Sequence, residues 1–517
     1  MARRAGTLNL AAGAAAAGVG LLTLVPLAAV AWRAGGLPAP GPADWAVLRF
    51  TLWQAVLSAT LSAGLAVPVA RALARRRFAG RGLIITLLGA PFLLPVIVAV
   101  LGLVAIFGRA GLMNAGLSAL GLPTVSVYGL GGVVLAHVFL NLPLATRLIL
   151  QGWLSIPSER FRLAESLGMG PAEVRRFLEA PMLAAVMPGA WLAIFLVCLT
   201  SFAVALVLGG GPGATTLEVA IYQAFRFEFD LGRAAALALM QAALCLAAVT
   251  VAGRAASRPG PGAGLDRAGA RVPAGGIWRR AVDTLAIGLA TAFLLAPLAA
   301  VVVSGLPNVA GLPPAVWAAA GRSLAMALAA TGLALALALP LALAAARAEG
   351  RGTGWGAIAM LPLAVSPMVV GTGLFLLLRG LAPPAVLALP VTVAVNAAMA
   401  LPFAFHALLP AARALTADYG RLADSLGMAG LARLRLLTLP RLRRPLGFSA
   451  GIAAAFAMGD LGVVALFGDP DRATLPLQLY RLMGAYRMEA AAGAAVLLMA
   501  LTLGLFWIFD RGGRADA

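Results

Sequence analysis

The sequence contains one heptapeptide twice, as LAESLGM at residues 163–169 and as LADSLGM at residues 422–428. The same offset of 259 residues relates Pro181 to Pro440. Further upstream, Pro68 and Pro95 correspond to Pro340 and Pro367 at an offset of 272 residues, so one loop of the first copy is about 13 residues longer. Because the landmarks recur in the same order, the sequence predicts a parallel duplication of one unit.

The composition around these copies is that of a membrane protein. Of the 517 residues, 62% are hydrophobic and 11% are charged, and the mean hydropathy is +0.96. A soluble domain has about 25% charged residues. The composition therefore excludes a soluble enzyme, a disordered scaffold and a disulfide-stapled secreted domain.

Twelve apolar stretches are long enough to cross a bilayer. They fall at about 11–32, 51–70, 83–108, 130–150, 183–208, 234–253, 282–304, 323–345, 355–378, 385–409, 446–468 and 490–509. We predict an all-α polytopic membrane protein with about 12 transmembrane helices in two parallel six-helix repeats. Six helices per copy keep both copies in the same orientation.

Arginine placement predicts the orientation. The chain carries 39 basic and 19 acidic residues, and no lysine occurs. An amino terminus in the cytoplasm puts 29 of the 39 arginines on the cytoplasmic side, which is the favoured arrangement. We expect a multi-pass protein with both termini cytoplasmic and a retained first helix, because the apolar run at 8–32 is too long for a signal peptide. This topology accounts for the positive charge, so we expect no nucleic-acid partner. We expect the chain to contact membrane lipid.

A segment rich in Gly, Pro and Arg separates the two copies. Its composition breaks the apolar pattern and is typical of a solvated linker. We predict a first six-helix domain over 1–253, a cytoplasmic linker over 254–280 and a second six-helix domain over 281–517.

Each copy has a cytoplasmic loop of about 30 residues that carries the heptapeptide. In the first loop we expect a helix from Ser158 to a left-handed end at Gly168, then a short helix over 172–179 that stops before Pro181. We expect the second loop to repeat this arrangement. Its first helix would begin at Ala417-Asp418 and end at Gly427, and its second would run over 431–439 to Pro440.

This pattern predicts a small apolar knob with an arginine collar on the membrane surface. Such a knob suits docking of a cytoplasmic partner, and two copies favour a partner with two-fold symmetry. The alternative is an amphipathic helix that faces lipid.

The two loops resemble the coupling loop of binding-protein-dependent ABC importers, whose pattern is Glu-Ala-Ala, three residues, Gly, nine residues and Ile-x-Leu-Pro. Both copies keep the family spacing of 13 residues between the glycine and the proline. Both depart from the pattern at its leading Glu, which is Arg162 in one copy and Arg421 in the other. The resemblance assigns ATPase coupling to Ala164, Glu165, Gly168, Pro181, Ala423, Asp424, Gly427 and Pro440.

Within that family, the whole chain resembles the fused two-domain permeases of thiamine (and thiamine pyrophosphate) importers. The stretches that carry this resemblance are 50–55, 128–130, 136–143, 208–216, 220–224 and 459–468. The fused permeases of ferric-iron importers share the architecture and remain an alternative. A 12-helix secondary transporter is a further alternative, although it would lack the paired loops.

The resemblance implies a permease subunit in the bacterial inner membrane, with two copies of an ATPase subunit below it and a periplasmic substrate-binding protein above it. The chain itself has no GxxxxGK[ST] loop, since it has no lysine. We therefore expect no enzymatic activity and no cofactor in this chain, with ATP used by the partner.

Asp460 is the candidate pathway residue. It lies in an apolar stretch predicted as the eleventh helix, where a carboxylate is costly and usually faces the interior or a watery path. A pathway carboxylate would suit a cationic substrate, and the alternative is a hydrogen bond between helices. His137 and His406 lack clustered partners, so we expect structural roles and no metal site.

Overall fold

The computed structural model describes residues 2–34, 41–88, 93–255, 276–348, 353–467 and 472–514. All regular elements within these ranges are helices, and none of them is a strand. A helix suits a bilayer because every backbone N–H and C=O in the hydrocarbon region must bond within the protein. The prediction of an all-α polytopic membrane protein is confirmed.

Eleven helices of the described part of the chain are long and apolar enough to cross a membrane. A twelfth span results when the segments Gly354–Ala364 and Pro367–Leu378, which meet at an angle of 87°, are counted as one. The eleven are Asn9–Ala34, Pro42–Arg75, Val96–Ala119, Leu130–Leu154, Pro171–Leu199, Leu231–Val251, Ile277–Asn308, Pro314–Arg347, Pro384–Ser425, Gly430–Phe467 and Met488–Arg514.

The order of the helices repeats along the chain. Nine first-half helices set the pattern, namely α1 (Ala2–Ala34), α2 (Pro42–Arg75), α3 (Arg81–Leu87), α4 (Val96–Phe107), α6 (Leu130–Leu154), α9 (Ala180–Leu199), α10 (Ala203–Leu208), α11 (Leu217–Arg226) and α12 (Leu231–Ala255). Their counterparts are α13 (Ile277–Gly305), α14 (Pro314–Arg347), α15 (Thr353–Met360), α16 (Pro367–Leu378), α17 (Pro384–Ser425), α19 (Leu439–Gly459), α20 (Gly462–Phe467), α21 (Leu475–Gly484) and α22 (Met488–Arg514).

One hydrogen bond shows how closely the halves correspond. The hydroxyl of Thr51 accepts from the N–H of Leu217 at 2.9 Å, which joins the start of α11 to α2. In the second half, the hydroxyl of Ser323 accepts from the N–H of Leu475 at 2.8 Å and joins α21 to α14. Both bonds satisfy an N–H at the first turn of a helix, where no intrahelical partner exists.

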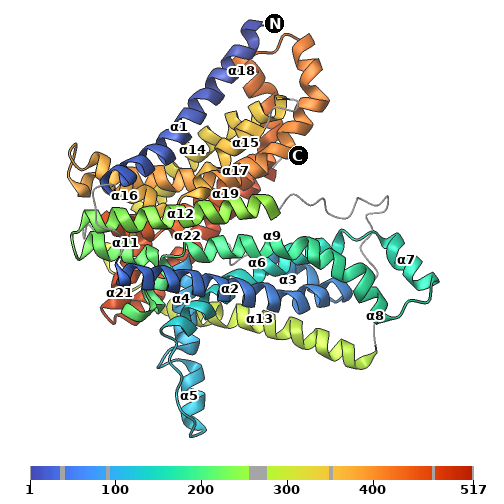
Figure 1. Cartoon of the computed structure of the whole chain (residues 1–517), viewed down its shortest axis with the longest axis vertical. Helices are drawn as coiled ribbons and strands as arrows, with labels where there is room; N and C mark the ends of the chain where they lie inside the picture. The colour runs from blue at the N-terminus through green and yellow to red at the C-terminus, as the bar shows by residue number, and fades with distance from the viewer. Residues whose placement is uncertain are drawn as a thin grey trace.

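The extra residues of the first half form α5 (Leu112–Ala119), which follows α4 and has no helical counterpart after α16 among the described residues. Figure 1 shows α5 projecting away from the rest of the molecule. The amide of Asn114 holds its base by donating to the carbonyls of Gly108 and Val125. The longer loop inferred from the offsets is therefore the segment that contains α5.

Four apolar stretches predicted as continuous helices are interrupted. The stretch 355–378 bends at Val365, and 83–108 divides into α3 and α4. The stretches 183–208 and 446–468 break at 200–202 and at 460–461. Hydropathy alone does not distinguish a bent span from a straight one, because both bury the same apolar residues.

The first helix of each half packs against the other half. Helix α1 lies against α14 and α16, whereas α13 lies against α2 and α4. Figure 1 shows α2, α6, α9 and α13 in one arm of the molecule and α1, α14, α17 and α15 in a second arm. The sequence repeats are therefore interlocked in space. Each arm contains the first helix of the other repeat, so the two arms do not coincide with the two repeats.

The predicted linker lies mostly outside the described residues. Helix α12 ends at Ala255 and α13 begins at Ile277, so helical residues occupy both margins of the predicted range 254–280. The domain boundaries stay a prediction.

Candidate functional site

The first glycine–proline loop is a compact helical turn that follows α6. Helix α7 (Ser158–Ser166) ends in a Schellman motif, in which Met169 N–H donates to the Ala164 carbonyl at 2.9 Å and Gly168 N–H donates to the Glu165 carbonyl at 3.0 Å. Gly168 has a φ of 65°, which is the left-handed conformation that its position predicts.

The second loop has the same turn. Met428 N–H donates to the Ala423 carbonyl at 2.9 Å, and Gly427 N–H donates to the Asp424 carbonyl at 3.1 Å. Gly427 has a φ of 67°. The heptapeptide therefore adopts one structure in both halves.

The chain leads into the two loops differently. Pro157 separates α7 from α6, whereas α17 continues without a break from Pro384 to Ser425. The expected helix start at Ala417-Asp418 is therefore wrong. The position that corresponds to Pro157 is Thr416, which has a backbone N–H and can continue a helix.

Both loops pass into the next span without stopping before the proline, so the predicted ends at residues 179 and 439 are also wrong. Helix α8 (Pro171–Val174) continues through a π-helical turn, η2 (Arg175–Glu179), into α9. Ala180 N–H donates to the Arg175 carbonyl, five residues back. The wider turn accommodates Pro181, which has no N–H to donate. Helix α18 (Gly430–Arg433) and η6 (Leu434–Thr438) repeat this arrangement before Pro440.

Each loop presents apolar side chains to its surroundings. Ala164 and Ala423 are buried, whereas Glu165 and Asp424 are exposed. Three exposed apolar positions are shared, namely Leu163, Leu167 and Phe177 in the first loop and their counterparts Leu422, Leu426 and Leu436 in the second. The second loop also exposes Leu431 and Leu439, where the first has alanines. Three large apolar side chains beside a rigid turn can dock into a groove of another protein.

The anchoring of the two loops differs. Buried Glu179 of η2 lies 2.6 Å from the guanidinium of Arg71 and 3.5 Å from that of Arg75, both in α2. Thr438 is the counterpart of Glu179, and its hydroxyl donates to the carbonyl of Arg433 at 3.2 Å. An ion pair to a neighbouring helix therefore fixes only the first loop among the described residues.

Asp460 lies at a helix break rather than inside the predicted eleventh helix, so that part of the prediction is wrong. Helix α19 ends at Gly459, and the Asp460 carboxylate accepts from the N–H of Gly462 at 3.1 Å. This local bond competes with helix continuation. The amide of Asn396 in α17 also donates to this carboxylate, at 3.5 Å.

The break at Asp460 faces the other half of the chain. A Cβ at Gly459 would lie 3.2 Å from Cα of Pro95, and one at Gly462 would lie 3.5 Å from the ring of Phe202. Asp460 is half-buried at this junction. Figure 1 places α7 and α18 at the ends of different arms, so the two loops and Asp460 form three separate sites.

A fully buried carboxylate also lies between the halves. Glu218 of α11 is fully buried beside Gln241 of α12 and Ser366 at the start of α16. Hydropathy does not reveal this residue, because α11 is too short to be predicted as a span. No group of three or more His, Cys, Asp or Glu side chains that could hold a metal occurs in the described part of the chain. His137 instead shares a hydrogen bond of 3.2 Å with Ser58.

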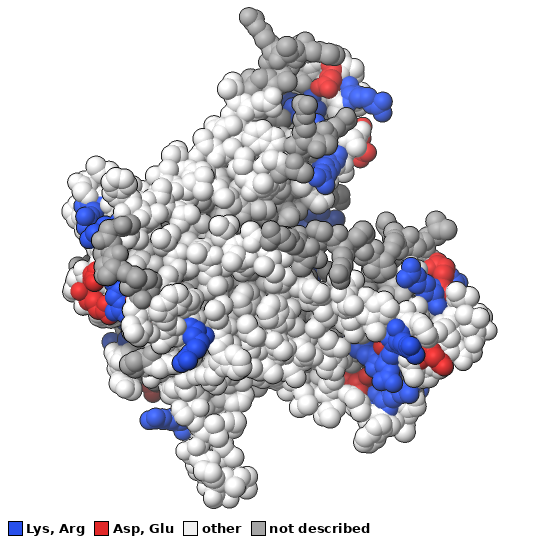
Figure 2. Space-filling view, viewed as in Figure 1, with Lys and Arg blue, Asp and Glu red and all other residues white. Residues whose placement is uncertain are grey.

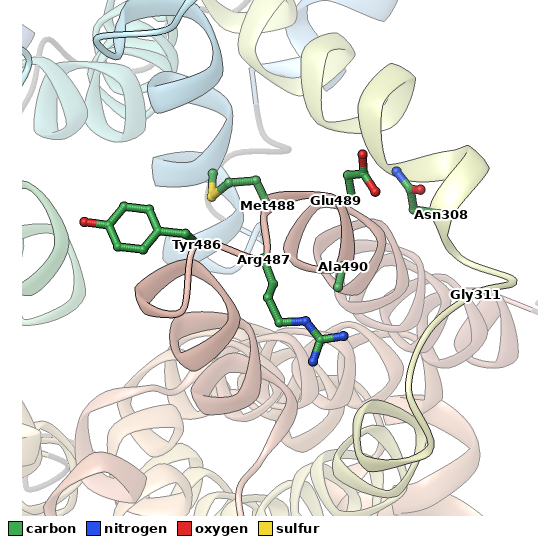
Figure 3. A pocket seen from close by; sticks show the side chains of 7 residues that line it. All are labelled: Asn308, Gly311, Tyr486, Arg487, Met488, Glu489 and Ala490. Carbon is green, nitrogen blue, oxygen red and sulfur yellow. The ribbon is translucent and has the colours of Figure 1, made fainter.

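The end of the molecule opposite α7 carries two related aromatic residues. Phe229 follows α11 with a φ of 53°, and Tyr486 follows α21 with a φ of 57°. Both are exposed, and a positive φ is strained for an aromatic residue. Beside Tyr486 lies a pocket of about 540 Å³ (Figure 3), where Tyr486 points away from Asn308 and Glu489.

Together, the interlocked repeats, the many spans and the paired loops define a polytopic membrane permease. No protein-family profile matches the chain. The chain is 43% identical to the thiamine transport system permease protein ThiP of Brucella abortus, over 99% of this chain and 95% of that protein. It is 43% identical to ThiP of Salmonella typhimurium and 42% identical to ThiP of Escherichia coli, in each case over 90% of this chain and 89% of the relative. The chain belongs to the family of thiamine transport system permease proteins.

Proposed function

We propose that this chain is the membrane-spanning permease of an ATP-driven ABC importer that takes up thiamine and thiamine pyrophosphate. The relatives named for thiamine transport support thiamine over the ferric-iron alternative. The observation that carries the ABC assignment is the pair of Schellman loops with equal glycine–proline spacing. A 12-helix secondary transporter has no use for two such loops.

The partner on the loop side would be two copies of an ATPase subunit, with one copy docked on each loop. The loops share three equivalent exposed apolar side chains beside the same turn, and this shared surface suits identical partners. ATP would bind to these subunits, because the permease has no lysine for a phosphate-binding loop. The relatives are named as permeases, and the proposal gives this chain no catalytic step and no cofactor.

The structure supports a direct mechanical route from each loop to the junction of the halves. The π-helical turns join the loops to α9 and α19 without a flexible linker. Helix α9 ends beside Ser201 and Phe202, and α19 ends beside Asp460. When the ATPase subunits close, the loops would approach each other and the two arms would rock about their shared end.

The face with Phe229 and Tyr486 would receive the periplasmic substrate-binding protein. Two exposed aromatic residues in related positions suit the two lobes of such a protein. This orientation puts the loops in the cytoplasm of a bacterial inner membrane. Both described chain ends would also be cytoplasmic, since Figure 1 shows the amino-terminal end beside α18 and Gly513 packs against Arg443 and Gly447 near the start of α19.

Thiamine carries a positive charge, so a carboxylate at the junction of the halves would favour its passage. Asp460 is our candidate for this role, because it is half-buried where α19 meets the first half. Its bonds to Asn396 and Gly462 hold the carboxylate in place.

Uptake of labelled thiamine by the complete reconstituted transporter tests the proposal. We expect uptake that requires ATP, competes with thiamine pyrophosphate and is unaffected by ferric iron. Uptake that proceeds in vesicles of the permease alone would contradict the ABC assignment. Competition by ferric iron without competition by thiamine pyrophosphate would contradict the assignment of thiamine as the substrate.

A further inference from the structure

An arginine pocket lies where α2, the α8–η2 turn and α13 meet. Its volume is about 160 Å³, and it is lined by the side chains of Arg71, Arg75, Arg175, Arg279, Val282 and Asp283. Figure 2 shows basic side chains gathered at this end of the molecule, in the region where Figure 1 places α8 and the start of α13.

The carboxylates near this pocket leave positive charge in excess. Asp283 lies 2.6 Å from Arg76, and Glu179 lies 2.6 Å from Arg71. No ion pair of Arg175 or Arg279 occurs among the described residues, and both side chains are exposed. Four pocket arginines and Arg76 therefore face two carboxylates.

Arg75 is the least satisfied of these groups. Its side chain is 8% exposed, its only described carboxylate contact is Glu179 at 3.5 Å, and its Nε is buried without a hydrogen-bond partner. A buried donor without a partner is costly. An anion in the pocket would supply the missing acceptor, and guanidinium groups match phosphate oxygens in pairs.

An apolar groove adjoins the arginine pocket. It lies between α2, α6 and α13, has a volume of about 650 Å³ and shares Val282 with the pocket. Leu65, Leu285 and Leu289 line it and are at least half exposed. All three lie in candidate membrane spans.

The groove has the length of one lipid leaflet. It follows α13 from Val282 to Phe293, which is about 17 Å at the helical rise of about 1.5 Å per residue. Half of the hydrocarbon core of a bilayer is about 15 Å. With the arginine pocket among the headgroups, the groove would therefore run through the acyl-chain layer of one leaflet.

We propose that this surface binds one anionic phospholipid, with its phosphate in the arginine pocket and an acyl chain in the groove. A free phosphate would use the pocket but not the groove, and the continuity of the two favours the lipid. The site combines α2 and the first loop with α13, the first helix of the second half, and it is not repeated at the equivalent place. The counterparts of Arg71 and Arg175 are Leu343 and Leu434. This inference is independent of the transported substrate.

Lipid binding to the purified full chain in detergent tests the proposal. Cardiolipin, phosphatidylglycerol and phosphatidylcholine are titrated separately and followed by native mass spectrometry. We expect the two anionic lipids to bind at least tenfold more tightly than phosphatidylcholine. The double variant Arg175→Gln/Arg279→Gln should lower anionic-lipid affinity by about thirtyfold, because each arginine near an anionic headgroup contributes about fivefold.

The matched control is Arg435→Gln/Arg444→Gln. It makes the same charge change on exposed arginines at the corresponding end of the second half and should leave affinity unchanged. An equal loss in both double variants would show general electrostatic attraction and overturn the site.

A second pair of measurements distinguishes a lipid from free phosphate. The double variant Leu65→Trp/Leu289→Trp fills the groove at exposed positions. It should lower the affinity for long-chain phosphatidylglycerol at least fivefold and have little effect on the affinity for dihexanoyl phosphatidylglycerol. Inorganic phosphate at millimolar concentration should not displace the lipid. Displacement by phosphate, with no effect of the tryptophans, would assign a free-phosphate site instead. Unchanged lipid affinity in the arginine variant, with loss of ATPase copurification, would assign these arginines to the protein interface.

Discussion

Gly102 of α4 packs directly against Pro297 of α13, and a Cβ at Gly102 would collide with the Pro297 carbonyl. The same contact recurs between Gly373 of α16 and Pro26 of α1. Each contact joins the first helix of one half to the other half, at the same offset of 271 residues. The absence of a side chain at both glycines is therefore what allows the two halves to interlock.

Replacing these glycines should loosen the interlock. Gly102→Ala and Gly373→Ala should each destabilise the chain by about 1–3 kcal/mol, as expected for overpacking against backbone. Thermal unfolding of the purified chain in detergent measures the change. Gly332→Ala is the control, because a Cβ there meets open space and alanine favours a helix. Equal melting temperatures for all three variants would refute the argument.

The coupling loops should fail when their left-handed turns are strained. Gly168→Val and Gly427→Val should each reduce thiamine uptake severalfold, because a Cβ in the left-handed conformation costs about 1–2 kcal/mol and valine is branched. Membrane insertion should stay normal. Gly168→Asn should retain most uptake, since asparagine tolerates this conformation. Normal uptake by the double valine variant would remove the loops from the coupling mechanism.

Substitutions can distinguish two alternative roles of Asp460, one in the substrate pathway and one in helix packing. Asp460→Asn keeps the shape and one acceptor oxygen for the Gly462 N–H, and its NH2 group can bond to Asn396 once that amide turns round. Because the charge is removed, a pathway role predicts a loss of uptake at near-normal thermal stability. A purely structural role predicts that Asn is tolerated, whereas Asp460→Leu lowers stability by about 0.6–2 kcal/mol. Uptake and melting assays on both variants decide between them, and full uptake by the Asn variant would end the pathway assignment.

Orientation can be tested with single cysteines. Ser166→Cys and Ser425→Cys at the loops should react with an impermeant thiol reagent only from the cytoplasm, and Tyr486→Cys only from the periplasm. All three positions are exposed, whereas the native Cys198 and Cys245 are buried and give a low background. Periplasmic labelling at Ser166 would reverse the topology and with it the side on which the ATPase docks.

The structure of the loops was predictable because it is local. A Schellman turn at Gly168 depends on residues within six positions of one another, and the heptapeptide contains them all. The unbroken α17 could also have been anticipated, since Thr416 replaces the proline that separates α6 from α7. Hydropathy does not predict the helix break at Asp460, because the residues on both sides of the break are apolar.

The sequence by itself determined the helical class, the duplication and the two turns, because composition, repetition and backbone preference act over short distances. Only the tertiary structure decided that α1 and α13 exchange partners and that Glu218 lies beside Gln241 and Ser366. It also brings Arg75 together with Arg279, 204 residues further along the chain. Such juxtapositions depend on how apolar helices of nearly equal hydropathy pack against one another, and that choice is made by the shapes of their surfaces rather than by any local pattern.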